Sequence, residues 1–229
     1  MRDDHKIALK QKKQQMNALC IRYGCIYEGN NWTQAHVQWL RKLKLPELIR
    51  EILDEYLATY DMLIDKIERF DKRIQEFADQ PQYQAKVKKL ECFLGIKTHT
   101  ALSLIVETGD YARNIYAAYL GLAPGEHSSS DDCNRLGITK AGNSHLRRLL
   151  IEASSGICKG VIGQKSKALK ERQAGNTVDV IAYADKANVR LRRKYYKLIH
   201  RGKKRNVAVA AVARELACFV WGMMTDNIA

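Results

Sequence analysis

ELIREILDEYLATYDMLIDKIERFDKRIQEFAD, residues 47–79, is the stretch that decides the fold. Its apolar side chains recur at a spacing of four and three residues, interrupted only by Asp71, and acids alternate with bases between them. This heptad pattern is typical of an α-helix that packs along one seam against a partner helix. We therefore predict one long helix here, whose seam residues are Leu53, Leu57, Tyr60, Ile64, Ile67, Ile74 and Ala78.

The partner of this seam is either a neighbouring helix of the same chain or a second copy. About four heptads with little other core nearby favour a protruding antiparallel or dimeric coiled coil. We expect a homo-oligomer that forms through this coiled coil.

The segments on either side suggest helices bounded by prolines. Residues 5–23 have helical spacing and a basic face, and residues 24–31 indicate a turn. Thr33 is a suitable cap for a second helix that ends before Pro46. We predict three parts: a helical linker over 1–46, the coiled coil over 47–80 and a C-terminal domain over 85–229.

A second helical hairpin follows Pro81. We expect one helix to end at Leu94, a tight turn at residues 95–97, and the next helix to start at Thr98 or Thr100. Free backbone N–H groups at such a helix start can face a phosphate, which is the logic of a helix-hairpin-helix motif. A plain helical hairpin within a core is the alternative.

The stretch GLAPGEHSSSDDCNRLGITKAGN, residues 121–143, is rich in glycine and serine, which is typical of a surface loop. It is either a plain turn or a loop that presents a serine nucleophile. His127 lies two residues before Ser129, but no Gly-x-Ser-x-Gly elbow and no preceding strand support a hydrolase triad. Asp131 and Asp132 would need distant partners to hold a metal ion.

The remaining segments are also helical. The stretch LRRLLIEASSGICKG, residues 146–160, is amphipathic, with Ser144 as its expected cap. We interpret Glu107 and Asp110, which flank a helix end, as solvated. Residues 207–224 form an apolar run that contains Arg214 and Glu215 and is typical of a buried core helix; we expect no membrane span. The chain shows almost no alternating strand pattern, so the predicted fold class is mainly α.

Positive charge is concentrated in one block. Residues 134–205 carry 19 Lys and Arg against 4 Asp and Glu, whereas the rest of the chain carries 20 against 21. Such a field attracts a polyanion, and DNA is the expected partner. The candidate nucleic-acid-binding residues are Lys97, Thr98, Arg135, Lys140, Asn143, Arg147, Arg148, Arg190, Arg192, Arg193, Lys194, Lys203 and Lys204.

The six cysteines form no Cys-x-x-Cys pair, and no histidine completes a zinc-finger spacing. The N-terminus is charged and has no apolar signal region. We expect reduced thiols and a cytoplasmic protein.

Several motifs together resemble the insertion sequence 110/116/902 family of transposases. The run FLGIKTHTALSLIVETGD (93–110), then YLGLAPGEHSSS (119–130), then RLGITKAGNSHLRRLLIEAS (135–154) resembles the C-terminal domain of that family. YGCIYEGNNWTQAHVQWL (23–40) and the coiled coil look like the family's middle region. The resemblance covers nearly the whole chain.

The resemblance implies a bridge-RNA-guided enzyme of DNA recombination in a prokaryotic, nucleoid-associated setting. Its catalytic serine corresponds to Ser129, with Ser128 and Ser130 as alternatives by one register. It also implies a structured guide RNA as partner, and dimers or tetramers in which domains of different subunits combine. Mg²⁺ is expected in an N-terminal RuvC-like domain with four acidic residues, and this chain is expected to bind no cofactor itself.

Two departures from the family pattern shape the functional hypothesis. The chain starts close to where the acidic domain would end, and the stretch between Asp110 and Tyr119 is a few residues shorter than usual. We expect a truncated transposase that binds DNA and carries the serine but does not act alone. The alternative is a non-catalytic nucleic-acid-binding or dominant-inhibitory remnant.

Overall fold

The computed structural model describes residues 1–111, 116–129 and 132–228, with the backbone alone at 127–129 and 132–135. These residues form two compact units, Met1–Arg73 and Ile74–Ala229. Helices dominate both, and the strands described are those of one two-stranded sheet, so the prediction of a mainly α fold is confirmed. The first unit contains α1 (Arg2–Arg22), α2 (Gln34–Lys42) and most of α3 (Glu47–Ala78).

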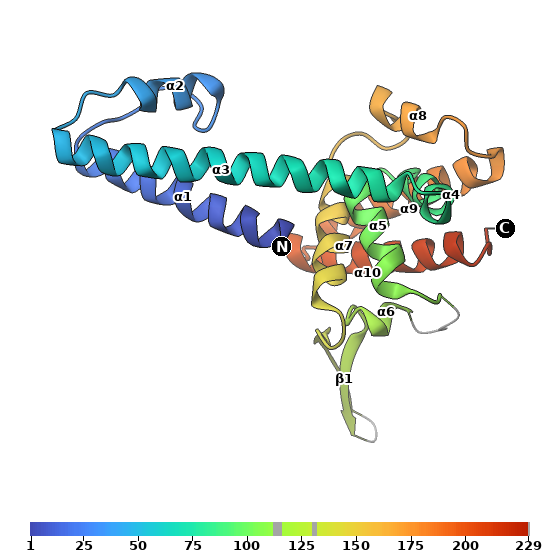
Figure 1. The fold of residues 1–229 in the computed structure, drawn as a ribbon. Helices are drawn as coiled ribbons and strands as arrows, with labels where there is room; N and C mark the ends of the chain where they lie inside the picture. The colour runs from blue at the N-terminus through green and yellow to red at the C-terminus, as the bar shows by residue number, and fades with distance from the viewer. Residues whose placement is uncertain (112–115, 130–131, 229) are drawn as a thin grey trace. The chain divides into compact units, whose positions relative to one another are not determined.

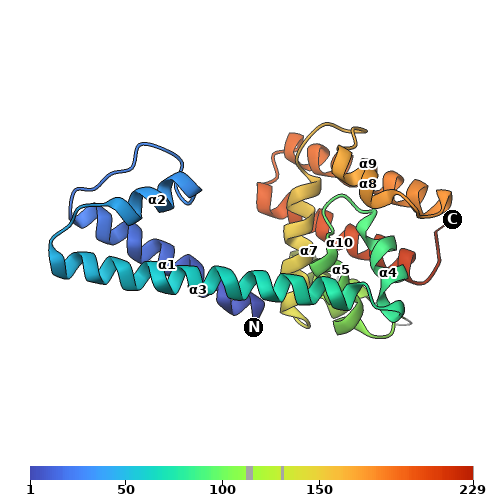
Figure 2. The ribbon, with the colours of Figure 1, turned by 45° about the horizontal axis from the view of Figure 1, so that its top comes forward.

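In the first unit, α1 lies along α3 in both ribbon views (Figures 1 and 2). The two helices are antiparallel: Arg2 at the start of α1 pairs with Asp71 late in α3, whereas Lys13 lies 5.7 Å from the ring centroid of Tyr60. Leu53 and Leu57 of the predicted seam are almost fully buried in this unit. A helix of the same chain therefore covers the seam, which favours the antiparallel alternative. Self-association through it remains a prediction.

Helix α2 packs on the same core, and side chains cap both of its ends. The Thr33 hydroxyl accepts a hydrogen bond from the backbone N–H of His36 at 3.2 Å, as predicted for the helix start. At the other end, the Arg50 guanidinium donates to the carbonyls of Leu40 and Leu43 at 3.0 and 3.1 Å. These bonds satisfy backbone groups that a helix end would otherwise leave unpaired.

The second unit is a cluster of helices (Figure 2). Their buried apolar side chains form one core. Helix α10 packs on α9 and α7, and α4 packs on α5. Ile74 and Ala78, at the end of α3, belong to this core. The elements of this unit are α4 (Pro81–Glu91), α5 (Thr98–Thr108), α6 (Tyr116–Tyr119), β1 (Pro124–Ser129), β2 (Asp132–Ile138), α7 (Ser144–Ile157), α8 (Lys167–Gln173), α9 (Val178–His200) and α10 (Arg205–Met224).

Helix α10 is long and apolar enough, by length and composition, to cross a membrane. Half of its apolar window is buried inside the second unit, where Val212, Leu216 and Val220 are fully covered. One helix of this kind is weak evidence for a membrane span. The burial of α10 agrees with the core helix predicted for residues 207–224.

The hairpin after Pro81 differs from the prediction in two ways. Helix α4 ends at Glu91, three residues before Leu94, and residues 92–97 form the turn. Gly95 serves close packing more than chain reversal: an added Cβ would lie within 2.9 Å of three backbone atoms of Ala153 on α7. Only a residue without a side chain fits between the turn and that helix.

Candidate functional site

The predicted serine loop is a β-hairpin. Strands β1 and β2 pair antiparallel, with Ser129 opposite Asp132, Ser128 opposite Cys133 and Glu126 opposite Arg135 in the register. The expectation of an irregular loop is therefore wrong for residues 124–138. Period-2 alternation is absent from the sequence because neither face of a projecting hairpin has to be apolar. Ser130 and Asp131 lie outside the described residues.

Tight backbone contacts fix the base of this hairpin. Gly121 has φ +63°, and a Cβ there would overlap the carbonyl oxygen of Ala141. The Lys140 N–H donates to the Gly121 carbonyl at 3.1 Å, and the Thr139 N–H donates to that of Ala123 at 2.9 Å. The strands thus leave the helical core from a defined platform.

Arg147, predicted to bind nucleic acid, holds this platform to α7. Its Nη1 donates to the carbonyl oxygens of Leu120 and Ala141 at 3.0 and 3.1 Å. These two carbonyls belong to the chain segments that enter and leave the hairpin. Arg147 is therefore a positioning residue for the hairpin that carries Ser129.

Asn143, and not Ser144, caps α7. Its Oδ1 accepts from the backbone N–H of Leu146 at 3.0 Å, and its Nδ2 donates to the Glu107 carboxylate at 2.9 Å. His145 Nδ1 lies 2.5 Å from the other oxygen of that carboxylate. The predictions of a Ser144 cap and of a solvated Glu107 are wrong: the residue before Ser144 takes the cap because Glu107 fixes its amide.

The candidate cations do not form one surface. Arg192 is buried, and its guanidinium donates to the carbonyls of Ile157 and Val161, so it cannot reach a phosphate. Arg190 and Lys194 both hold the Glu215 carboxylate. Burial alone would raise the pKa of Glu215, but these two hydrogen bonds outweigh it and keep that pKa below its usual value.

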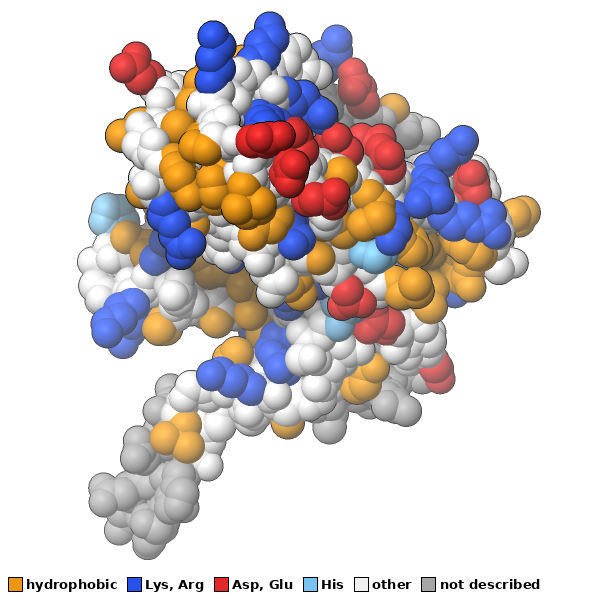
Figure 3. Space-filling view, turned by 60° about the vertical axis from the view of Figure 1, so that its left-hand side comes forward, with side chains coloured by type: hydrophobic (Ala, Val, Ile, Leu, Met, Phe, Trp, Pro, Cys, Tyr) orange, Lys and Arg blue, Asp and Glu red, His pale blue; other side chains and the backbone are white. Residues whose placement is uncertain are grey.

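The other candidates lie at several places. Arg148 pairs with Glu152 at 2.9 Å, and Thr98 Oγ1 donates to Glu91 at 2.6 Å. Lys97, Lys140, Arg193, Lys203 and Lys204 are exposed, whereas the side chain of Arg135 is not described. Figure 3 shows Lys and Arg side chains in separate groups on one face of the molecule.

One face of α9 carries a basic stripe that the sequence reasoning did not isolate. Its members are all exposed and recur at spacings of four and three residues, so they share one side of the helix. From first to last they span about 22 Å at 1.5 Å per residue, which corresponds to about six base pairs along one strand of a duplex. The helical spacing was the signal that could have found it. We call it the α9 stripe: Lys186, Arg190, Arg193, Lys197 and Arg201.

Among the residues that the structure describes, no three His, Cys, Asp or Glu side chains are placed to hold a metal ion.

Comparison with known proteins identifies relatives of the hairpin-containing region. Residues 87–166 match the family model described as transposase IS116/IS110/IS902 family. A putative transposase, y4qE, of Sinorhizobium fredii is 34% identical over 224 residues, which cover 95% of this chain and 54% of the relative. The transposase for insertion sequence element IS1533 of Leptospira borgpetersenii is 27% identical over 217 residues, or 89% of this chain and 60% of the relative.

A third relative matches over a shorter range. The transposase for insertion sequence element IS1111A of Coxiella burnetii is 30% identical over 130 residues, which cover 51% of this chain and 35% of the relative. The chain spans about half the length of the curated relatives that it matches over most of its sequence. The matched family region, 87–166, contains both strands of the hairpin and all of α7.

Proposed function

We propose that this chain acts in DNA transposition, in which its C-terminal unit binds DNA and presents Ser129 as nucleophile. The match of residues 87–166 to the IS116/IS110/IS902 transposase family supports this proposal. One observation carries the proposal. The hairpin that contains Ser128 and Ser129 is anchored to α7 inside the family-matched region, and the α9 stripe belongs to the same compact unit.

The chemistry is a phosphoryl transfer that conserves the phosphodiester. The serine oxygen attacks phosphorus and loses its proton to a base or water, and the departing sugar oxygen takes up a proton. The product is a phosphodiester that joins the serine to one DNA end. A sugar hydroxyl of another strand then attacks the same phosphorus and releases the serine. No external energy source is needed, because each bond broken is replaced by one of the same kind.

Cations near the serine would stabilise charge on the phosphoryl oxygens in the transition state. Arg135 lies on β2 of the hairpin, opposite Glu126 in the strand pairing. Lys140 is exposed at the base of the hairpin. Binding energy is proposed to come from elsewhere: the α9 stripe would contact the phosphates of one strand. A structured guide RNA is the second nucleic-acid partner that we propose to test.

A covalent-adduct assay tests the nucleophile. The protein, with Mg²⁺, labelled DNA containing the ends of its element, the element's RNA and an intact family member, would be resolved on a denaturing gel. We expect an adduct at the mass of this chain that Ser129→Ala abolishes and the matched control Ser128→Ala retains. If Ser128→Ala alone abolishes the adduct, the nucleophile is Ser128 and not Ser129. Binding without any adduct would favour the alternative of a non-catalytic or inhibitory DNA-binding protein.

The α9 stripe has its own test in the salt dependence of DNA binding. Arg193→Gln and Lys197→Gln should each weaken binding to all sequences alike and reduce the slope of log K against log salt by about one. Lys170→Gln on α8, an exposed cation outside the stripe, is the control and should leave the slope unchanged. Equal slopes in all variants would contradict a phosphate-binding stripe.

A further inference from the structure

The second unit contains a cavity of about 570 Å³ between α9 and α10. The α9 residues that line it include Tyr183, Lys186 and Arg190, and the α10 residues include Glu215 and Phe219. Because the members of each set lie three or four residues apart, one face of each helix lines the cavity. Its volume falls within the range of roughly 300–1,000 Å³ that is common for small-ligand sites.

Two aromatic rings lie at one end of this cavity. The ring centroids of Tyr183 and Phe219 are 5.5 Å apart, and the ring planes meet at 70°. Both rings are partly buried and pack on the apolar core of the unit. A Cβ at Gly222 would overlap the Tyr183 hydroxyl, so this glycine lets the hydroxyl lie against α10. The core therefore fixes both rings in place, and fixed rings of this kind offer a stacking surface to a nucleobase.

Cations line the rest of the cavity. Lys186, Arg190, Lys194 and Arg214 all belong to its wall, where Glu215 is the one carboxylate among the described lining residues. Arg190 donates from Nε to that carboxylate, and its side chain is nevertheless 68% exposed. Lys186 is exposed and makes no ion pair with another described residue. The cavity thus keeps an excess of positive charge for a phosphate.

The order of rings and cations along α9 matches the parts of a nucleotide. Lys186 and Arg190 follow Tyr183 by three and seven residues, which is roughly 4.5 and 10.5 Å along the helix axis. These two cations are also the first two members of the α9 stripe. A strand whose phosphates follow the stripe therefore passes the mouth of the cavity.

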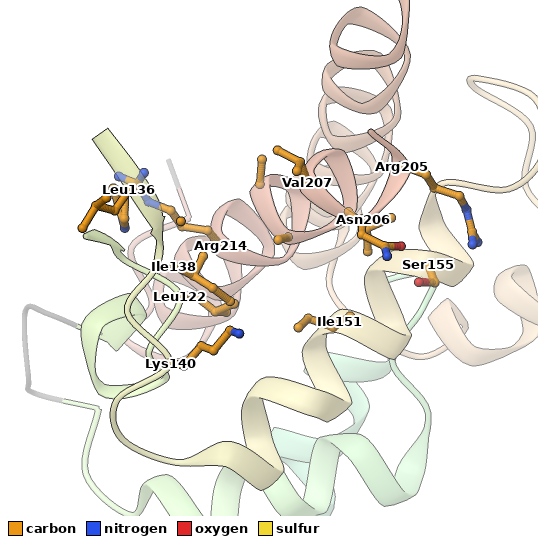
Figure 4. A pocket seen from close by; sticks show the side chains of 15 residues that line it. Leu122, Leu136, Ile138, Lys140, Ile151, Ser155, Arg205, Asn206, Val207 and Arg214 are labelled. Carbon is orange, nitrogen blue, oxygen red and sulfur yellow. The ribbon is translucent and has the colours of Figure 1, made fainter. Parts of the chain in front are cut away.

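A second cavity, at the hairpin base, lacks these features. Figure 4 shows Arg214 of α10 together with the hairpin residues Leu136 and Ile138 that line it. Its described lining residues include no aromatic ring, and an aliphatic wall leaves the polar edges of a base unpaired. Arg214 lines both cavities, so the one between α9 and α10 lies next to the hairpin that carries Ser129.

We propose that the cavity between α9 and α10 holds one unpaired nucleotide of the DNA strand that the α9 stripe binds. The base stacks on Tyr183 or Phe219, and the adjoining phosphates contact Lys186 and Arg190. This inference rests on the proposed DNA binding by the stripe, and it adds a preference for DNA with a base outside the duplex. A fully paired strand lacks this contact, because its bases stay stacked within the helix.

Fluorescence anisotropy with three duplexes of equal length tests the proposal. One duplex is fully paired, one has a single bulged nucleotide, and one has the same bulge without its base. We expect the bulged duplex to bind about tenfold more tightly than the paired one, and the abasic bulge to lose that gain. Phe219→Leu should abolish the gain and leave the affinity for the paired duplex unchanged. Phe77→Leu, at an exposed ring outside the cavity, is the matched control and should retain the gain.

Cys218 provides a second test that leaves the aromatic rings intact. It is exposed and lines the cavity. A bulged base that carries a thiol linker as a mixed disulfide should exchange with the Cys218 thiolate, which joins the linker to Sγ and releases the small thiol. Cys218→Ser should abolish this cross-link, and Cys25→Ser, at a partly exposed cysteine of the first unit, should retain it.

The stripe and the cavity fail in distinguishable ways. An unchanged affinity of Arg193→Gln for the paired duplex contradicts the stripe, whereas equal affinities of the wild-type chain for paired and bulged duplexes overturn the cavity proposal. An abasic bulge that binds as well as the complete one, or a cross-link that survives Cys218→Ser, also overturns it. A bulge preference confined to RNA strands would assign the cavity to RNA. Displacement of the bulged duplex by an equal concentration of a deoxynucleoside monophosphate would assign it to free nucleotides, and either result defeats the proposal.

Discussion

Substituting alanine for Gly95 tests how closely the turn between α4 and α5 is packed on α7. An alanine Cβ would lie 2.6 Å from the carbonyl carbon of Ala153 and 2.9 Å from its Cα, and would overlap the carbonyl oxygen. Real Cβ atoms almost never approach so closely, and helix backbone cannot rotate away as a side chain can. The turn must therefore move off α7, which also loosens its fully buried neighbours Phe93 and Ile96.

The free-energy cost follows from two opposing contributions. Overpacking of a well-packed core costs about 1–3 kcal/mol, and a backbone clash belongs at the upper end of that range. Reduced freedom of the unfolded chain returns about 0.4–1 kcal/mol. The net loss is about 2 kcal/mol, which should lower the Tm of the second unit by about 4–8 °C for a domain of about 150 residues.

Urea and thermal unfolding followed by circular dichroism would measure this loss. Gly137→Ala is the matched control, because a Cβ at that position meets nothing within 4 Å; its free energy of unfolding should stay within about 0.5 kcal/mol of wild type. A Gly95→Ala variant as stable as wild type would refute the close approach of the turn to α7. Equal losses in both variants would refute the assignment of the cost to the Ala153 contact.

Three further changes have defined outcomes. Arg192→Ala should lower the free energy of unfolding by about 2–3 kcal/mol in urea titrations, because it leaves the carbonyls that Arg192 holds unpaired, whereas Arg193→Ala should lower DNA affinity in a filter-binding assay without changing stability. Asn143→Ala should lower the free energy of unfolding by about 1 kcal/mol because the α7 cap is lost, whereas Ser144→Ala should change it by less than about 0.5 kcal/mol. Equilibrium unfolding measures both losses, and a larger loss for Ser144→Ala would show that Ser144 is the cap. Burial raises the pKa of the Cys158 thiol to about 11. As the pH rises, the thiol of the unfolded chain therefore deprotonates before that of the folded chain. The contribution of Cys158 to the free energy of unfolding is complete below about pH 8.5 and falls by about 1.4 kcal/mol per pH unit as the pH rises to about 11. Unfolding at pH 8 and pH 10 would measure that slope, and Cys158→Ala should reduce it.

The helices were predictable because their signals are local. The apolar spacing in residues 47–79 and the run at 207–224 fix helices regardless of what they pack against. Thr33 was found as a cap because the residue type and its position before an apolar stripe suffice. The α9 stripe was equally readable from its spacing, although the sequence reasoning picked cations by density and so included the buried Arg192.

The candidate site was less predictable because its contacts join residues distant in sequence. Asn143 caps α7 with its amide held by Glu107, 36 residues away, and no local rule distinguishes it from Ser144. The hairpin at 124–138 lacks alternation because its faces are not required to be apolar. The Ser129 assignment rests on a family resemblance, and its role as nucleophile remains a prediction.

By itself, the sequence determined a mainly helical chain with a long amphipathic helix, a basic C-terminal block and motifs that resemble a transposase family. Periodicity, composition and short motifs are properties of neighbouring residues, so they are present before the chain folds. Only the tertiary structure decided which cations remain at the surface, that α1 covers the seam of α3, and that Gly95 must lack a side chain. Those outcomes depend on which distant atoms come into contact, and a linear pattern does not encode that directly.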